Sequence, residues 1–307
     1  MRVGVFYRLF KAEQKKLSRS ACIHLAWVLP LLFALAAFFV FDYRMLGVKD
    51  FTEKQIGLAD GVQVNLTSAL WGAFFFPILI ALLPALIFRV EHRVKAWRYL
   101  GAMPVSGSQI YLAKALWAAI LSLASLVAVW FLLLLSRVLV ANAMPQDLVL
   151  KFYGLDLALI LGWLWLGALP VMTFYLWASN RINSLAVPVM LGMVGILLTT
   201  ALTSQYVEEP WKRDFIPWIT PHICAAQALG AAEASKKQSL AGDLFKEKPD
   251  ILRLPDGREK RTWQNIPEDV LNPPPIPTPK SALAAYSLVL GTVFLLGGAL
   301  DAGRLRR

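Results

Sequence analysis

Six long runs of apolar residues dominate the chain, and none of them contains Asp, Glu, Lys or Arg. A bilayer core is about 30 Å thick, so roughly 20 apolar residues are needed for one helix to cross it. Several runs contain proline, which membrane helices tolerate better than soluble helices do. The pattern predicts six membrane-spanning helices, at residues 21–41, 69–88, 115–136, 157–178, 184–204 and 281–300.

Composition and charge assign the chain to the membrane proteins. Of its 307 residues, 57% are hydrophobic and 17% charged, and the mean hydropathy is +0.55. With the N-terminus inside, fifteen Lys and Arg residues fall in cytoplasmic segments and five in the short outer loops 42–68 and 137–156. This asymmetry predicts a multi-pass protein of the plasma (inner) membrane with both termini cytoplasmic. It also accounts for the net charge of +11 without nucleic acid as a partner.

Residues 1–20 precede the first apolar run and predict an interfacial amphipathic helix, with apolar and basic side chains on separate faces. The alternative interpretation is a charged tail that only fixes orientation. A cleavable signal peptide is not expected, because the apolar run that follows is too long and starts too late. The apolar face comprises Val3, Phe6, Phe10 and Leu17, and the basic face Arg8, Lys11, Lys15 and Lys16.

Residues 205–280, between the fifth and sixth runs, predict a large outer loop. Its first part carries Trp211 and Trp218 among charges and prolines, which favours short helices lying at the outer membrane surface. The polar centre contains a turn signal at Pro255-Asp256-Gly257, and a proline-rich spacer at 272–279 leads into the last run. A small folded insert and a disordered loop both remain open for residues 233–281.

The sequence offers no recognisable catalytic chemistry. It has no HExxH, GxSxG or GxxxxGK[ST] motif, and its histidines lack the spacing of metal ligands. Cys22 and Cys224 fall on opposite sides of the predicted membrane and cannot pair. Only His24 could ionise inside the six runs, whereas ion-coupled transporters need ionisable groups at membrane depth. We therefore expect no catalytic residue, no metal site and no enzyme activity in this chain, so that energy for any transport must come from another chain.

Residues 89–114 form a basic, aromatic segment between the second and third runs. Val90, Val94 and Trp97 recur at helical spacing, which predicts that the second helix continues into the cytoplasm. Gly101 and Pro104 would end that helix, and residues 106–108 supply a turn and a cap for the next. This is the one sizeable cytoplasmic segment that a partner protein could bind.

The segment resembles that of ABC-2 type exporter permeases, and among them the lantibiotic-immunity and bacitracin-type permeases. The resemblance rests on an acidic residue that opens the loop, a Trp/Lys pair, a Leu-x-x-x-Pro run and a Lys that enters the third helix. The amphipathic N-terminus, the six runs and the short turn at 179–184 support it. The matching positions, which the family's pattern makes ATPase-coupling residues, are Glu91, Lys95, Trp97, Arg98, Pro104 and Lys114.

The resemblance implies an all-α fold with six transmembrane helices, an N-terminal interfacial helix and an extracytoplasmic insert between helices five and six. It divides the chain into 1–20, a transmembrane part 21–204, the loop 205–280, and a last helix with a basic tail at 281–307. It further implies a cytoplasmic ABC ATPase that binds ATP and Mg, a second permease copy or paralogue, and an amphipathic peptide or lipid-like substrate. A scaffold or regulator that anchors a partner through residues 89–114 is the alternative.

Overall fold

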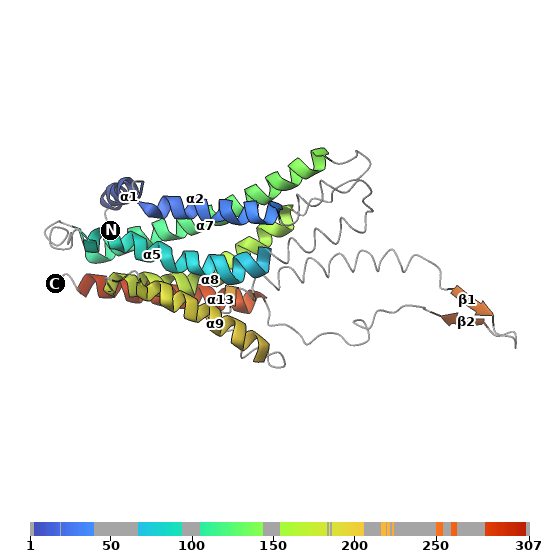
Figure 1. Cartoon of the computed structure of the whole chain (residues 1–307). Helices are drawn as coiled ribbons and strands as arrows, with labels where there is room; N and C mark the ends of the chain where they lie inside the picture. The colour runs from blue at the N-terminus through green and yellow to red at the C-terminus, as the bar shows by residue number, and fades with distance from the viewer. Residues whose placement is uncertain are drawn as a thin grey trace.

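The computed structural model describes residues 3–18, 20–39, 67–93, 105–143, 154–182, 184, 186–205, 216–218, 220–221, 223, 250–253, 259–262 and 280–304. Within them the chain forms a bundle of long helices and one small two-stranded sheet (Figure 1). The helices are α1 (Val3–Leu17), α2 (Ala21–Ala37), the π-helix η2 (Thr67–Phe75) continued by α5 (Phe76–Arg93), α7 (Gly107–Ala143), α8 (Gly154–Arg181), α9 (Ala186–Gln205) and α13 (Lys280–Arg304).

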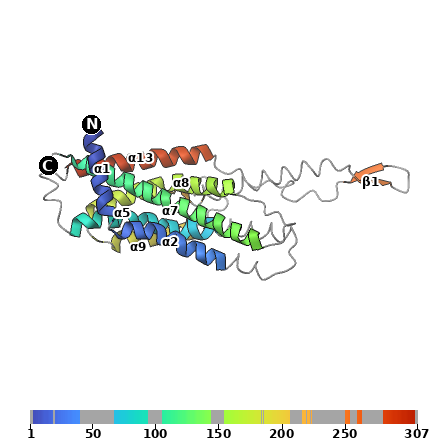
Figure 2. The same ribbon diagram turned by 90° about the horizontal axis from the view of Figure 1, so that it is seen from above.

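Helices distant in sequence pack side by side. α13 lies along α8 and α7, α2 lies along α7, and α5 packs against α8 and α9. One end of the bundle collects the last turns of α5, α8 and α13 and the first turn of α7, and α1 lies there as well (Figures 1 and 2). At this end the His92 imidazole lies 3.2 Å from the backbone carbonyl of Ser179, which links α5 to α8. We call it the charged end, because ionised side chains gather there.

Among the described residues, four helices are long and apolar enough to cross a membrane: Leu70–His92, Gly107–Leu139, Leu157–Arg181 and Ala282–Arg304. They correspond to the second, third, fourth and sixth predicted spans. The first predicted span is α2, which meets α1 at an angle of 65°, and counting this bent pair raises the number to five. The fifth predicted span is α9, whose apolar part, Ala186–Leu197, is shorter than the helices that could cross a membrane. The helical membrane architecture is confirmed for the described residues, whereas the count of six remains a prediction.

Helix α7 begins eight residues before the predicted third span, inside the 89–114 segment. Ser106 caps it: the Ser106 hydroxyl accepts a hydrogen bond from the backbone N–H of Gln109, and the Gln109 side chain accepts one from the Ser106 N–H, both at 3.3 Å. This reciprocal pair is a capping box, which satisfies two backbone donors that the first helical turn would leave free. The predicted cap is confirmed.

Replacing this cap should weaken the start of α7. We expect Ser106→Ala to lower the free energy of unfolding by about 1 kcal/mol, a usual effect of losing a serine N-cap. Hydrogen exchange of the Gln109 amide should increase relative to amides in the middle of α7. Ser108→Ala is not a matched control, because the Ser108 hydroxyl ties α7 to α13 by donating to the Ala299 carbonyl at 2.7 Å. Ser18→Ala is one, because Ser18 is exposed just after α1 and its hydroxyl donates within its own turn, to the Lys15 carbonyl. Equal protection in Ser106→Ala and Ser18→Ala would contradict the capping role.

The predicted outer insert contains regular structure that its composition did not indicate. Strands β1 (Asp250–Arg253) and β2 (Glu259–Thr262) pair antiparallel, with Asp250 opposite Thr262 and Arg253 opposite Glu259. The predicted turn at 255–257 falls between them, where an antiparallel pair needs one. The hairpin lies beyond the end of the bundle opposite α1 (Figure 1). A folded element is therefore present, and the rest of 233–281 up to α13 lies outside the described residues.

The structure corrects the prediction for Trp218, which we expected at the outer membrane surface. Its indole N–H donates to the Tyr175 hydroxyl at 3.2 Å, and its ring packs edge-on against Phe174. Tyr175 lies only six residues before the end of α8, near the charged end. Farther along, Pro221 lies against Gly167, and Ile223 packs with Leu283 at the start of α13. The described part of residues 216–223 therefore packs against the bundle along α8, half-buried at 216–218 and buried at 220, 221 and 223.

Candidate functional site

Two predicted site residues mark the ends of the 89–114 segment. Glu91 lies in the last turn of α5, and Lys114 lies two turns into α7. The helices place both side chains inside the bundle, where Glu91 is 2% and Lys114 1% exposed. Burying an isolated charge costs several kcal/mol, so each must be compensated by partners nearby.

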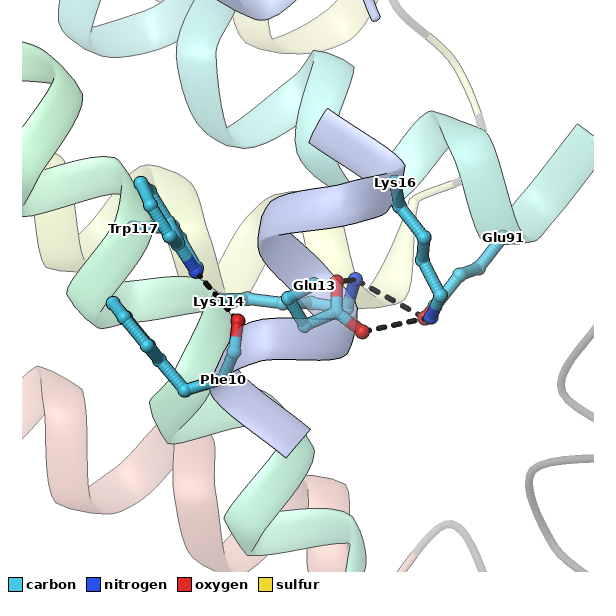
Figure 3. A network of polar contacts seen from close by, with 6 residues as sticks. All are labelled: Phe10, Glu13, Lys16, Glu91, Lys114 and Trp117. Carbon is cyan, nitrogen blue, oxygen red and sulfur yellow. Dashed lines mark hydrogen bonds and ion pairs between the residues drawn. The ribbon is translucent and has the colours of Figure 1, made fainter. Parts of the chain in front are cut away.

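The compensation comes from α1, which supplies one carboxylate and one ammonium group (Figure 3). Lys114 Nζ lies 3.0 Å from Glu13 Oε2 and 3.1 Å from Glu91 Oε1. Lys16 Nζ lies 2.8 Å from Glu13 Oε1 and 3.2 Å from Glu91 Oε1. Two ammonium and two carboxylate groups thus alternate in a closed ring of four ion pairs, the four-charge ring, with no net charge. The ring ties α1, α5 and α7 together.

Aromatic contacts fix α1 beside the ring. The Phe10 ring stacks on the Trp117 indole with centroids 4.6 Å apart and planes 10° apart. The same indole N–H donates to the Phe10 carbonyl at 3.1 Å (Figure 3). Leu17 is buried in the main hydrophobic core. Phe10 and Leu17, on the apolar face of α1, therefore pack on protein. The alternative of a free charged tail is wrong. An interfacial helix would turn these two side chains toward lipid, whereas here they contact other helices of the bundle. Phe6 is half-buried.

Electrostatics favour the charged forms of the α1 residues. Burial acts to raise the pKa of the Glu13 carboxyl, but the Coulombic attraction of Lys114 and the hydrogen bond from Lys16 outweigh it and lower that pKa below its usual value. Burial acts to lower the pKa of Lys16, but its contacts with Glu13 and Glu91 raise it overall. A lowered carboxyl pKa contributes stability that is present above the unfolded-state pKa and is lost as the pH falls through the folded-state value. Glu13 and Lys16 should thus remain charged at neutral pH.

Lys114 makes one contact outside the ring, and one oxygen of Glu91 has no hydrogen-bond partner in the part of the chain that the structure describes. The Lys114 ammonium lies 5.4 Å from the centroid of the Phe88 ring, a cation–π distance. Glu91 Oε2 is buried and has no hydrogen-bond partner among the described residues. No cluster of His, Cys, Asp and Glu in the described ranges could hold a metal ion. The ring is suited to joining helices rather than to covalent chemistry.

The structure brings together only part of the predicted site. Glu91 and Lys114 meet, but as buried ring members they present no surface to a second protein, which corrects their expected role as direct contacts. The other predicted coupling residues stay predictions, since they lie outside the described residues, as does Trp211. Those coupling residues are Lys95, Trp97, Arg98 and Pro104.

Sequence reasoning missed Glu13 as a functional residue, although a signal was present. Glu13, Glu91 and Asp301 are the only acidic residues in the segments predicted to be cytoplasmic, which are otherwise basic. The structure places all three in ion pairs at the charged end, since Asp301 accepts hydrogen bonds from the Arg181 guanidinium, one of them at 2.7 Å. A lone acid in a basic membrane-proximal segment was therefore the sign of a specific partner.

Comparison of the sequence with known protein families finds one match. The profile of a family described as ABC-2 family transporter protein matches residues 9–199, more than half of the chain, and this range includes all four members of the ring. No curated protein and no solved structure matches the chain significantly.

Proposed function

The chain belongs to the ABC-2 transporter family, and from this membership we propose that it is the exporter permease through which a separate ATPase moves an amphipathic peptide or lipid-like substrate out of the cytoplasm or membrane. The family establishes a membrane permease of an ABC transporter and implies association with an ABC ATPase subunit. Substrate, direction, lantibiotic or bacitracin-type specialisation, and a location in the plasma (inner) membrane with cytoplasmic termini belong to the proposal.

The four-charge ring carries the proposal. An ATPase that binds residues 89–114 must transmit its movement to the helices, which requires that the base of the segment be rigid. Lys114 pairs with Glu91 across that base, and both pair with α1. A displacement of the segment would therefore move α1, α5 and α7 together. Helix movements of this kind convert ligand binding in one subunit into a change of state in another.

The distribution of charge supports the proposed substrate class. The apolar runs predicted to span the membrane carry no Asp, Glu, Lys or Arg, while Glu91, Lys114, Arg181 and Asp301 lie at the charged end. Transport of ions or protons needs ionisable groups at membrane depth. An apolar interior instead suits a substrate with large hydrophobic parts. In this proposal ATP and Mg bind to the partner ATPase, this chain catalyses nothing, and it works with a second permease copy or paralogue.

The docking part of the proposal is tested on Trp97 and Arg98, residue types that often dominate interfaces. We expect Trp97→Ala to weaken co-purification with the ATPase at least about 30-fold, as for a hot-spot residue that contributes 2 kcal/mol or more. Trp27→Ala is the matched control, since Trp27 is 55% exposed on α2. Binding affinity and ATP hydrolysis of the reconstituted complex would be measured with both variants.

Two outcomes would contradict the proposal. Equal ATPase affinity of Trp97→Ala, Trp27→Ala and wild type would remove residues 89–114 as the docking surface. In the second outcome, the chain binds the ATPase tightly but moves no labelled amphipathic peptide or lipid across proteoliposome membranes when ATP is added. That result would support the alternative, a scaffold or regulator that anchors a partner through residues 89–114.

A further inference from the structure

Helices α8 and α13 lie side by side at the charged end of the bundle (Figures 1 and 2). A groove is lined there by residues of both helices. Its volume is about 430 Å³, within the range of cavities that hold small ligands, roughly 300–1,000 Å³. The groove is separate from the four-charge ring. Its lining comprises Trp177 of α8 and Val293, Phe294, Gly297, Gly298, Leu300, Asp301 and Arg304 of α13.

The floor and walls of the groove are apolar and face outward. Val293 is 59% and Leu300 67% exposed, and only 28% of the most apolar window of α13 is buried. Gly297 contributes no side chain, and a Cβ added there would meet nothing within 4 Å. The missing side chain at Gly297 therefore leaves a hollow in the apolar face of α13. This face contacts the hydrocarbon of the bilayer if α13 spans the membrane.

One end of the groove is charged, and its balance is positive. The Asp301 carboxylate is paired with the Arg181 guanidinium, which lies 6.0 Å from the centroid of the Trp177 ring. Pairing offsets the negative charge of Asp301. Arg304, one turn farther along α13, is exposed at the end of the helix and adds a positive charge. From Val293 to Arg304 the helix rises about 16 Å.

We propose that this groove binds an anionic phospholipid, with its phosphate near Arg304 and an acyl chain along Val293 and Gly297 toward the middle of the membrane. A phospholipid has this order of groups: a charged head at the helix end and a chain that points inward. Basic pockets between transmembrane helices attract anionic headgroups. A second copy related by a two-fold axis along the membrane normal would carry its own basic end of α13 at the same level of the membrane, so it would bring further positive charge to the level of Arg304 and no anionic group to pair with it. Charge complementarity therefore favours the lipid.

The test measures lipid binding to the purified chain alone, by native mass spectrometry with phosphatidylglycerol or phosphatidylcholine added to the detergent. It needs no ATPase, so its result is independent of the proposed transport function. We expect preferential binding of phosphatidylglycerol and an affinity about fivefold lower in Arg304→Gln, the effect of one basic residue near a headgroup. Gly297→Leu, which fills the hollow, should remove most binding of this lipid. Inorganic phosphate at the same concentration should not compete, because it lacks the acyl chain.

Matched controls separate the site from general effects. Arg89→Gln removes one exposed charge from the same end of the bundle, and Gly162→Leu adds the same side chain at an open glycine of α8. Both should bind phosphatidylglycerol like the wild type. Equal affinity for the two lipids, or equal losses in Arg304→Gln and Arg89→Gln, would overturn the proposal. So would a photo-crosslinker at Leu300 that joins two copies of the chain instead of joining the chain to lipid.

Discussion

Replacing Lys114 with methionine should be among the most damaging single substitutions in this protein. Lys114 is 1% exposed and pairs with Glu13 and Glu91, which are 1% and 2% exposed. Without its ammonium group, two buried carboxylates would share Lys16 alone, whose side chain is 38% exposed. Removing one partner of a buried pair usually costs about 3–5 kcal/mol, because the remaining charge stays buried without compensation. The melting temperature of the purified chain in detergent should fall by on the order of 10 °C.

A second substitution should restore much of this loss. In the double variant Glu13→Gln, Lys114→Met, the ring retains one carboxylate, Glu91, and one ammonium group, Lys16, so its charges balance again. A double-mutant cycle should therefore give a strongly favourable coupling energy between Glu13 and Lys114. Lys15→Met, which removes the exposed cation at the position next to Lys16 in α1, should change stability by no more than about 0.5 kcal/mol. If Lys114→Met melts like Lys15→Met, the ring does not stabilise the fold.

The same residue shows how far a hydrophobicity pattern can be taken. Charge-free run length predicted helices at the right places, but it started the third helix at residue 115, after Lys114. The observed α7 begins at Gly107, because Ser106 caps it there. Because Lys114 is charged, the predicted run could begin only after it. Its ion pairs with Glu13 and Glu91 nevertheless allow Lys114 to lie inside the bundle. A rule that counts charges cannot tell a paired lysine from a solvated one.

The ring itself depends on contacts that local sequence does not contain. Glu13 and Lys114 are 101 positions apart, and Lys16 and Glu91 are 75 apart. Periodicity reports which face of one helix is apolar, not which helix will lie against it. The scarcity of acids in the basic segments was the available signal, and it indicated that Glu13 has a partner without naming Lys114.

The inserted segment at 216–223 was missed for a different reason. Tryptophans among prolines and charges are typical of a membrane surface, so composition favoured that location for Trp218. In the structure the Trp218 indole instead packs against Gly195 of α9, where an added Cβ would clash with the ring. Space for the ring exists only because Gly195 lacks a side chain. The information therefore lay in a glycine of another helix, which a single sequence does not connect to Trp218.

Gly167→Ala tests this insertion, and we expect it to displace the segment from α8. A Cβ at Gly167 would lie 2.8 Å from the Pro221 Cα and 3.1 Å from the Thr220 carbonyl oxygen. These are backbone atoms, which cannot rotate away as a flexible side chain could. The Thr220 N–H and hydroxyl both donate to the Ile216 carbonyl, at 3.0 and 2.9 Å, so that this turn would have to move as a unit. Overpacking of this kind usually costs about 1–3 kcal/mol.

The matched control is Gly162→Ala on the same helix, where an added Cβ meets nothing within 4 Å. Alanine favours a helix by up to about 1 kcal/mol over glycine, so this variant should be as stable as the wild type or more so. Thiol labelling of Ile223→Cys, in a chain whose two native cysteines are replaced, reports the position of the segment, because Ile223 is 6% exposed. Labelling should be slow with Gly162→Ala and fast with Gly167→Ala. Equal rates would mean that Gly167 does not hold residues 216–223 against α8.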